Sequence, residues 1–352
     1  MSKQEVIICR DFADELRKTL AKHSFDKLFV LTDEHTRRSC WPVISQLDCL
    51  KDAVIISIGP GDIHKNLETL AYVWNRLCDE GATRRSLLLN LGGGMVTDLG
   101  GFAAATFKRG IPYINIPTTL LSMVDASVGG KTGINFNGLK NEIGAFRPAE
   151  TVLIDCRFLR TLDCENILSG YAEMLKHGLI SRVSHWSELV DFDMETIDYD
   201  RLQQLVGESV QVKEGIVEQD PFEHGIRKAL NLGHTVGHAF ESFALQKRPV
   251  LHGYAVAWGM VCELYLSALK TGFPKERLHQ TLRFIKENYG RLEFTCNDYE
   301  TLFNFMKHDK KNFSAGTINF TLLGDVGDIR INQTATQEEI YELLDFYSET
   351  MG

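Results

Sequence analysis

Apolar side chains in the first third of the chain follow two patterns. Residues 27–33, 53–58 and 86–91 are short runs rich in Val, Ile and Leu, which predict buried β-strands. Residues 67–78 instead carry apolar side chains at helical spacing, which predicts an amphipathic helix. Strands that alternate with helices in this way indicate a mostly parallel sheet with helices on its faces.

The pattern changes near residue 160. A further strand is predicted at residues 114–117 and a last one ending near Asp155, and helix-forming sequence dominates from about Arg160 onward. We therefore predict two domains, an α/β domain over residues 1–159 and a largely α-helical domain over residues 160–352. A length of 352 residues is sufficient for two such cores.

A glycine-rich turn follows the third predicted strand. Residues 92–94 are glycines, and the alanine-rich helical stretch after them contains Asp98. A strand that leads through such a turn into a helix is the setting in which backbone N–H groups hold a pyrophosphate, so we predict a Rossmann-like domain. The spacing is not GxGxxG, and close helix packing is the alternative explanation. Asp33 and Asp62, at presumed strand or turn ends, could bind ribose hydroxyls or act only as caps.

A second glycine turn, at residues 125–133, carries Lys131. It combines a backbone nest for an anion with a point charge. Lys140 and Asn141 follow it and add a second cation and an amide. The Walker spacing is absent, which argues against an NTPase. Two glycine-rich anion sites in one domain indicate two anionic groups, a dinucleotide and a phosphorylated substrate.

A polar pattern in the second half points to a metal. Asn231, His234 and His238 recur at three- and four-residue spacing in an apolar background, so a helix would place all three near one face. Two imidazoles one turn apart, with His252 nearby in sequence, suit a divalent metal. A pair of ordinary core histidines is the alternative. Spacing alone favours His234 and His238 as the ligands.

Glu173 is the candidate for a third ligand. It precedes Lys176 by one turn in an otherwise apolar helical stretch. A surface ion pair is the usual meaning of this spacing. The apolar neighbours argue against a solvated face, and a carboxylate is an accepted partner of imidazole around zinc.

Composition and charge narrow the class of protein. The formal net charge of −9 argues against a nucleic-acid binder, so an anionic ligand must be bound by a local group of cations. Lys213 and Arg227 supply two, and the basic run at residues 307–311, normally a solvated surface, supplies more. The eight cysteines form no CxxC pair, the N-terminus has no signal-peptide pattern, and no apolar run is long enough for a membrane span. We therefore expect a cytoplasmic protein with neither nucleic-acid nor membrane partners.

Together these motifs resemble the 3-dehydroquinate synthases, a family of the sugar-phosphate cyclases. The resemblance covers roughly residues 30–325 in consistent order. The segments that carry it include the glycines at 92–94 with Asp98, residues 107–110, 117–121, 125–131 and 140–141, Glu173 with Lys176, Lys213, residues 227–238, His252 with Gly253, and residues 309–311. It implies an NAD-binding α/β domain packed on a largely helical metal-binding domain, with the active site in the cleft.

The resemblance also assigns the metal and changes one expectation. In the family the ion is zinc, or cobalt in some members, held by one Glu and two His that match Glu173, His234 and His252. His238 then becomes a residue for substrate or proton transfer, although spacing alone favoured it as a ligand.

The implied reaction is that of a lyase. The substrate is a phosphorylated sugar acid, 3-deoxy-D-arabino-heptulosonate 7-phosphate, and the products are 3-dehydroquinate and phosphate, in the shikimate pathway to chorismate and the aromatic amino acids. The hydride taken up by NAD is returned, so no net oxidation occurs. A homodimer is implied as well, because Arg109 reaches the phosphate of the other subunit in the family.

Two sets of residues follow from this resemblance. Those for substrate are Arg109, Lys131, Asn141, Lys176, Lys213, Arg227, Asn231, His238 and Lys310. Those for NAD are Asp33, Asp62, Lys65, Gly93, Gly94, Asp98, Thr118, Thr119, Asp125, Lys140, Phe158 and Thr161. The chain departs from the family pattern at Asp62 and Tyr254, where Glu is usual, and at residues 136–137 and Arg147.

Two other functions fit parts of the pattern. A related cyclase could act on a sugar phosphate without a carboxylate, but Lys213 and Arg227 would then have no evident partner. A metal-dependent polyol dehydrogenase would release NADH, and the number of cations argues against it.

Overall fold

The structure, a computed structural model, describes residues 4–307 and 318–352. The chain divides into two compact units, one formed by Met1–Asp163 with Tyr199–Val210 and the other by Cys164–Asp198 with Gln211–Gly352. None of the helices in the described ranges combines the length and apolar character needed to cross a membrane.

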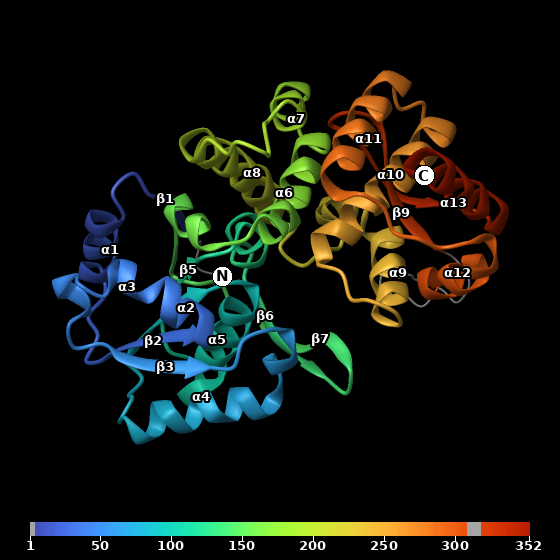
Figure 1. Ribbon diagram of the computed structural model, residues 1–352. Coiled ribbons are helices and arrows are strands. Elements are labelled where there is room, and N and C mark those ends of the chain that lie inside the picture. Colours follow the sequence, from blue (N-terminus) through green and yellow to red (C-terminus); the bar gives the residue numbers. More distant parts are fainter. Residues whose placement is uncertain (1–3, 308–317) are drawn as a thin grey trace. The chain divides into compact units, whose positions relative to one another are not determined.

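The first unit is built on a parallel six-stranded sheet (Figure 1). Its strands, in spatial order, are β1 (Glu5–Ile8), β8 (Thr151–Ile154), β5 (Tyr113–Pro117), β4 (Leu87–Gly92), β2 (Leu28–Asp33) and β3 (Val54–Ile58). All side chains of β4 and β5 are buried, as expected for central strands of a parallel sheet that is covered on both faces. The prediction of an α/β fold with a mostly parallel sheet is confirmed.

Helices connect these strands. They are α1 (Phe12–Ala21), α2 (Glu34–Ser39), α3 (Trp41–Ile44), α4 (Leu67–Asp79) and α5 (Gly94–Thr106), with short helical turns η1 (Asp48–Leu50), η2 (Asp62–His64), η3 (Phe107–Arg109), η4 (Ser122–Ala126) and η5 (Cys156–Thr161). The predicted amphipathic helix is α4, which begins after the N-cap Asn66 and buries Leu70, Val73 and Leu77. α5 packs on β2, β4 and β5.

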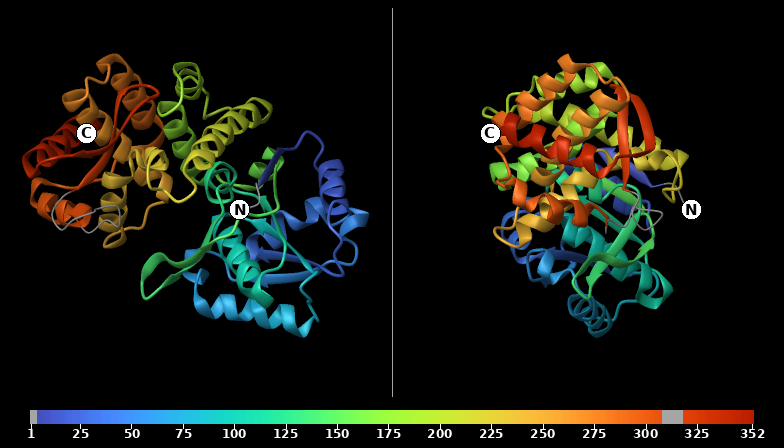
Figure 2. Two further views of the ribbon diagram at one scale, coloured as in Figure 1. Left: turned by 180° about the vertical axis from the view of Figure 1, so that it is seen from behind. Right: turned by 90° about the vertical axis from the view of Figure 1, so that its right-hand side faces the viewer.

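An antiparallel hairpin projects from this unit. β6 (Lys131–Phe136) pairs with β7 (Leu139–Phe146), and in two views the hairpin extends away from the main sheet (Figures 1 and 2). Asn137 and Gly138 form its turn with φ angles of 50° and 78°, which is the Asn-Gly pattern of a tight hairpin. The segment predicted as a glycine turn therefore leads directly into a strand that begins at Lys131.

The second unit is largely helical. Its helices are α6 (Cys164–Leu179), α7 (Val183–Val190), α9 (His234–Leu245), α10 (His252–Lys270), α11 (Lys275–Tyr289), α12 (Tyr299–Lys307) and α13 (Gln337–Met351), with turns η6 (Ile226–Asn231) and η7 (Cys296–Asp298). An antiparallel pair, β9 (Asn319–Asp325) and β10 (Asp328–Thr334), accompanies them and was not predicted. α10 is the central element, because it packs against α6, α9, α11, α13 and β9.

The helix α8 (Tyr199–Gln219) shows why a single boundary at residue 160 is too simple. The division into units assigns its residues 199–210 to the first unit and 211–219 to the second. The Gln203 side chain donates to the carbonyl of Cys9 and accepts from the N–H of Cys156, which anchors this part of α8 to β1 and η5. The local spacing of apolar residues does not show that a later segment of the chain packs back on an earlier unit.

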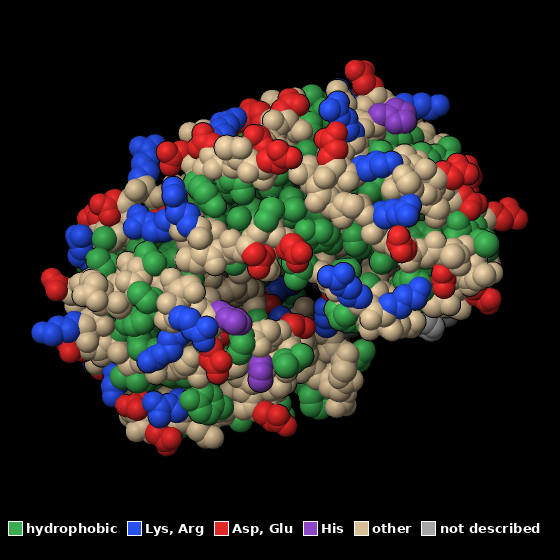
Figure 3. Space-filling view, viewed as in Figure 1, with side chains coloured by type: hydrophobic (Ala, Val, Ile, Leu, Met, Phe, Trp, Pro, Cys, Tyr) green, Lys and Arg blue, Asp and Glu red, His purple; other side chains and the backbone are tan. Residues whose placement is uncertain are grey.

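Charges are mixed on the face that Figure 3 draws. On the face drawn in Figure 3, acidic and basic side chains of the described residues alternate, and no broad region of one sign is visible. On this face, a charged ligand would be recognised by individual side chains rather than by a broad field of one sign.

Candidate metal centre and anion-binding residues

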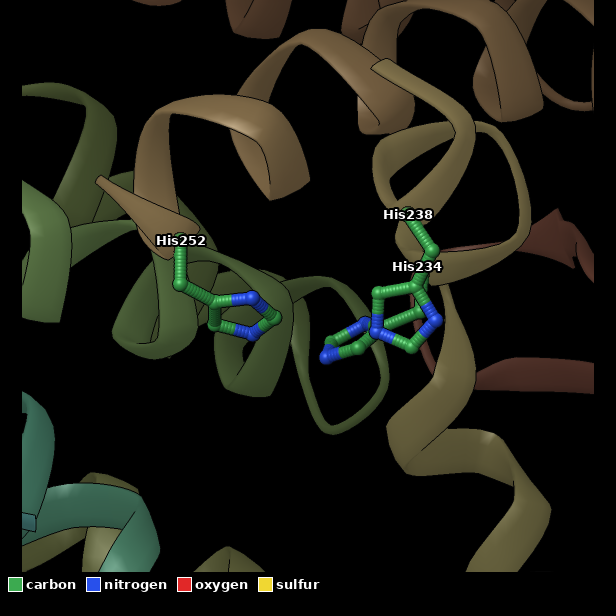
Figure 4. A group of neighbouring side chains, drawn as sticks. All are labelled: His234, His238 and His252. Atoms are coloured by element: carbon green, nitrogen blue, oxygen red, sulfur yellow. The ribbon is translucent and has the colours of Figure 1, made fainter. Parts of the chain in front are cut away.

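Three helices of the second unit converge on one cluster of side chains. Glu173 comes from α6, His234 and His238 from the first turns of α9, and His252 from the start of α10. In Figure 4 the His252 ring reaches from α10 toward the rings of His234 and His238 on α9. Nitrogen atoms of the three histidines, one from each, all lie within 4.8 Å of one another.

Glycines make this convergence possible. A Cβ atom on Gly253 would lie 1.9 Å from the carbonyl oxygen of Ser169 on α6, and one on Gly259 would lie 2.0 Å from the carbonyl oxygen of Gly233. Both contacts are with backbone, which cannot move aside cheaply. α10 therefore touches α6 at one point and the start of α9 at another, and this brings His252 close to Glu173 and His234.

The distances suit a shared ion. Oε1 of Glu173 lies 3.4 Å from Nε2 of His234 and 3.7 Å from Nε2 of His252. Two ligand atoms at about 2.0–2.1 Å from a tetrahedral zinc would lie roughly 3.3–3.4 Å apart. This oxygen is also fully buried without a hydrogen-bond partner among the described residues. A buried, unsatisfied carboxylate oxygen facing two imidazole nitrogens is what a divalent cation would satisfy.

The protonation states agree with that interpretation. Burial raises the pKa of Glu173, but the paired ammonium of Lys176 and the neighbouring imidazoles outweigh burial and hold the pKa well below its usual range. Burial lowers the pKa of His252, but the neighbouring carboxylates of Glu173 and Glu241 outweigh burial and raise this pKa to about 9. The carboxylate is thus ready to bind, and a metal at His252 would displace a proton.

Two further groups orient the imidazoles. Nδ1 of His252 lies 3.1 Å from Oε2 of Glu241, and Nδ1 of His234 lies 3.1 Å from the carbonyl oxygen of Leu232. These acceptors favour the tautomers that leave both Nε2 atoms available for an ion. Glu241 was missed in the sequence, although an acidic residue one turn after His238 in an apolar helix was a usable signal.

One sequence prediction about this segment is wrong. Asn231 does not share a helix with His234, because Gly233 has a φ of 80° and separates η6 from α9. Asn231 instead donates to Oε1 of Glu223. The three-residue spacing was correct, but an αL glycine between the two residues ends any common helical face.

Lys176, Lys213 and Arg227, which were also predicted to bind substrate, are buried cations. Lys176 is paired with Glu173, Lys213 lies on α8, and Arg227 lies in η6, where its guanidinium donates to the carbonyl of Pro221. The carboxylate of Asp220 accepts from the backbone N–H of Arg227 and so fixes the loop. Lys310 lies outside the described residues.

In the first unit, the structure joins several predicted anion and ribose residues into one network. The buried ammonium of Lys65 donates to Asp98 on α5 and to Oδ1 of Asn141 on β7. Asn135 accepts from the N–H of Asn141 and donates to the carboxylate of Asp62. Residues predicted separately for NAD and for phosphate are therefore linked, directly by Lys65 and also through Asn135, which the sequence did not single out.

The glycine turn has the expected form. α5 begins at Gly94, and its N-cap, Gly93, provides no side-chain cap. A Cβ on Gly93 would lie 2.9 Å from the Thr119 side chain, so the backbone passes close to the turn that contains Thr118 and Thr119. α5 has an ordinary length, and its start has no side-chain cap. The backbone N–H groups at such a helix start can bind a phosphate. Asp125 follows on η4, a π-helical turn of a kind often found at functional sites.

The remaining residues predicted to bind the dinucleotide differ in their burial and in their hydrogen bonds. Asp33 caps α2 through a capping box with Thr36, which agrees with the alternative interpretation of this acid as a cap. Phe158 is fully buried with its ring against Phe12, so its side chain is part of the core. Thr161 donates to the carbonyl of Phe158. Lys140 is exposed on the hairpin.

The glycine at the α6 contact leads to a testable prediction. Gly253→Ala must separate α10 from α6, and we expect it to lower the free energy of unfolding by about 1–3 kcal/mol and to weaken metal binding. Gly215→Ala is the control, since nothing lies within 4 Å of the position that a Cβ would take there on α8, and Ala should stabilise this helix by up to about 1 kcal/mol. Chemical denaturation and a cobalt titration measure both effects. Unchanged metal affinity in Gly253→Ala would contradict the role given to this contact.

Comparisons with known proteins agree with this geometry. Residues 55–169 match the family model for the 3-dehydroquinate synthase N-terminal domain, and residues 170–312 match that for the C-terminal domain. A 3-dehydroquinate synthase of Parabacteroides distasonis is 58% identical over 353 aligned residues, which cover 100% of both chains.

Solved structures share the fold. A 2-epi-5-epi-valiolone synthase from Streptomyces hygroscopicus, with NAD+ and Zn2+ bound, has a TM-score of 0.84 and 26% identity, covering 99% of this chain and 97% of that one. A 2-deoxy-scyllo-inosose synthase complexed with carbaglucose-6-phosphate, NAD+ and Co2+ has a TM-score of 0.84 and 21% identity, covering 97% and 95%. Because the two family models together span most of the chain and the identity to a full-length relative is high, the chain belongs to the 3-dehydroquinate synthase family.

Proposed function

We propose that this protein converts 3-deoxy-D-arabino-heptulosonate 7-phosphate into 3-dehydroquinate and phosphate, as a lyase that uses NAD and a divalent metal. The observation that carries the proposal is the convergence of the buried Glu173 with the partly exposed His234 and His252, in a chain that belongs to this family. When bound, the metal would polarise the hydroxyl that is oxidised, and NAD would accept and return the hydride.

Zinc and cobalt both fit the metal site. One carboxylate oxygen and two imidazole nitrogens are the ligand types of a catalytic zinc site, which keeps a further position open for substrate. Glu241 and the Leu232 carbonyl would hold the two imidazoles in place. Lys176, buried beside Glu173, would keep this carboxylate ionised.

The cations of the second unit would bind the carboxylate of the substrate. Lys213 and Arg227 are buried, and a cation held away from water attracts a carboxylate more strongly than an exposed one does. Arg227 is held by the Pro221 carbonyl and, through its backbone, by Asp220. His238, next to the two ligand imidazoles, would transfer a proton to or from the substrate.

The phosphate would be bound by Lys131, Asn141 and Arg109. Lys131 begins β6 and Asn141 lies on β7, so the hairpin carries both. Asn141 has a φ of 52°, and its Oδ1 accepts from Lys65, which leaves its amide N–H2 group to donate. The contacts of Lys65 to Asp98 would tie this group to the residues proposed for NAD.

A homodimer is part of the proposal, because Arg109 would act on the partner's phosphate. Lys108 and Arg109 both have positive φ, at 49° and 71°, immediately before Gly110 at 116°. Two consecutive non-glycine residues in this region store strain, which is commonly retained for function. Arg109 is exposed in η3, which follows α5, as a residue that reaches out of its own subunit must be.

Two variants in this strained turn distinguish an effect on stability from an effect on activity. Lys108→Gly and Arg109→Gly each relieve a positive φ, so neither should destabilise, and a gain of up to about 1 kcal/mol is expected. Only Arg109→Gly should lose phosphate release. Denaturation curves and a phosphate-release assay compare the two.

Mixing two variants tests whether Arg109 acts in the site of the partner subunit. Arg109→Gly and Lys131→Ala should each be strongly impaired alone at a substrate concentration below KM. After unfolding and refolding together, a mixed dimer would contain one intact site, and about a quarter of wild-type activity should return. Absence of any recovery, with mixed dimers demonstrated by mass, would place Arg109 in its own subunit's site.

The proposed reaction is tested by measuring phosphate release from the heptulosonate phosphate, with and without a chelator, together with NADH fluorescence. We expect stoichiometric phosphate release without accumulation of free NADH, and loss of activity on chelation that added Zn2+ or Co2+ restores. Stoichiometric NADH release would instead identify a dehydrogenase. Turnover of a sugar phosphate that lacks a carboxylate, with none of the acid, would identify another cyclase.

A further inference from the structure

One buried carboxylate of the second unit lies outside the ligand set and outside the proposed substrate residues. Glu263, on α10, is fully buried. Its Oε2 accepts from the N–H of Gly233 at 2.7 Å, and its Oε1 accepts from the N–H groups of Thr235 at 2.9 Å and Val236 at 3.1 Å. These donors lie immediately on both sides of His234.

The position of this contact in the fold is unusual for a helix cap. α9 begins at His234 itself, and its N-cap is a glycine in the left-handed conformation without a side chain. The N–H groups of the first turn have no partner within the helix and need one from elsewhere. Glu263 supplies it from a different helix, about thirty residues further along the chain, and its negative charge suits the positive end of the α9 dipole.

The same helix also carries His252 at its first residue. Gly259, between His252 and Glu263 along α10, lies so close to Gly233 that a Cβ would be 2.0 Å from the Gly233 carbonyl oxygen. α10 is therefore fixed to the turn before His234 by a backbone contact and by three hydrogen bonds. α10 therefore carries the His252 imidazole and also fixes the backbone that carries the His234 imidazole.

We propose that Glu263 is a positioning residue for the metal site: its carboxylate fixes the backbone around His234 so that the His234 and His252 imidazoles are set for one ion before the ion binds. This inference rests on the proposed function, since it takes His234 and His252 as metal ligands. Glu263 itself contacts neither metal nor substrate in this account. Its effect reaches the ion only through the His234 backbone.

The alternative is that Glu263 only stabilises the contact between two helices. Metal affinity distinguishes the two, because a general loss of stability in a protein that remains folded does not change the geometry of a ligand. A suitable control is Ser267→Ala on the same helix. The buried hydroxyl of Ser267 donates to the Glu263 carbonyl and accepts from the N–H of Leu323, away from the His234 turn.

The experiment is a titration of the metal-free protein with Co2+, followed by the visible absorption of the bound ion. In Glu263→Gln an amide N–H2 group replaces one acceptor and faces a backbone donor. We expect the Co2+ affinity to fall 10–100-fold, as for groups that orient metal ligands, with a changed spectrum. Ser267→Ala should lower the unfolding midpoint but keep affinity within about twofold and the spectrum unchanged. Wild-type affinity and spectrum in Glu263→Gln would overturn the inference.

The inference can fail separately from the proposed function. If His234→Ala and His252→Ala bind Co2+ as the wild type does, the metal site is wrong; if they lose Co2+ while Glu263→Gln retains it, only the role of Glu263 is wrong. Should Glu263→Gln not fold, amide hydrogen exchange in metal-free wild-type protein decides. Slow exchange at Thr235 and Val236 is expected from a turn already held by Glu263, and exchange as fast as in an unfolded peptide would contradict it.

Discussion

Glu173→Gln is expected to abolish metal binding and turnover together. The amide keeps the size of the side chain, but it replaces a carboxylate whose pKa is held low by Lys176 and whose Oε1 faces the two imidazoles. A neutral amide is a much weaker ligand for zinc or cobalt than a carboxylate. We expect the metal affinity to fall more than about 100-fold and phosphate release to fall to background. Metal content after dialysis and phosphate release measure these effects.

The choice of glutamine matters for this test. Glu173→Ala would leave the buried Lys176 ammonium without its partner, and breaking a buried pair in this way typically costs about 3–5 kcal/mol. Loss of activity could then reflect unfolding alone. Glu165→Ala is the matched control, because Glu165 lies in the first turn of α6 and is exposed. It should retain metal and activity. A Glu173→Gln protein with full metal content and turnover would show that Glu173 is not a ligand.

Lys131→Ala is expected to lose substrate binding while NAD affinity is largely retained. A charge-assisted contact to phosphate contributes about 1.5–3 kcal/mol, so kcat/KM should fall roughly 10- to 150-fold. Lys131 starts β6, whereas Gly93 is the N-cap of α5 and Asp125 lies on η4. Steady-state kinetics give kcat/KM, and fluorescence quenching gives the NAD affinity.

Lys51→Ala controls for the loss of one positive charge. Lys51 is exposed in the turn before β3 and belongs to neither proposed residue set. Its removal should leave kcat/KM unchanged at physiological salt. Normal saturation kinetics in Lys131→Ala would contradict the phosphate role, and an equal loss of NAD affinity would place Lys131 with the dinucleotide.

The spacing of apolar residues predicted those helices and strands whose burial follows one regular pattern along the element. β4 is buried on both faces, so its apolar run is continuous, and α4 has one buried stripe, so its spacing is helical. β10 was not predicted, since its burial alternates weakly between exposed and partly exposed positions along a polar sequence. The π-helical turn at Asp125 was not predicted either, because it differs from an α-turn by one residue of hydrogen-bond register.

In the candidate site, too, some residues could be predicted from the sequence and others could not. The pattern around His234 and His238 pointed to a metal, but spacing within a helix could not show that His252, on another helix, lies beside them. The resemblance to a known family supplied that assignment. Glu241 and Glu263 were not found, because their importance lies in contacts across helices that only the packed structure reveals.

The most direct test of the account is anomalous diffraction at the zinc edge from crystals of the zinc-loaded protein. We predict one peak in the second unit, at about 2.0–2.2 Å from Oε1 of Glu173 and Nε2 of His234 and His252. A peak bound by His234 and His238 without Glu173, or none near α6, would contradict it.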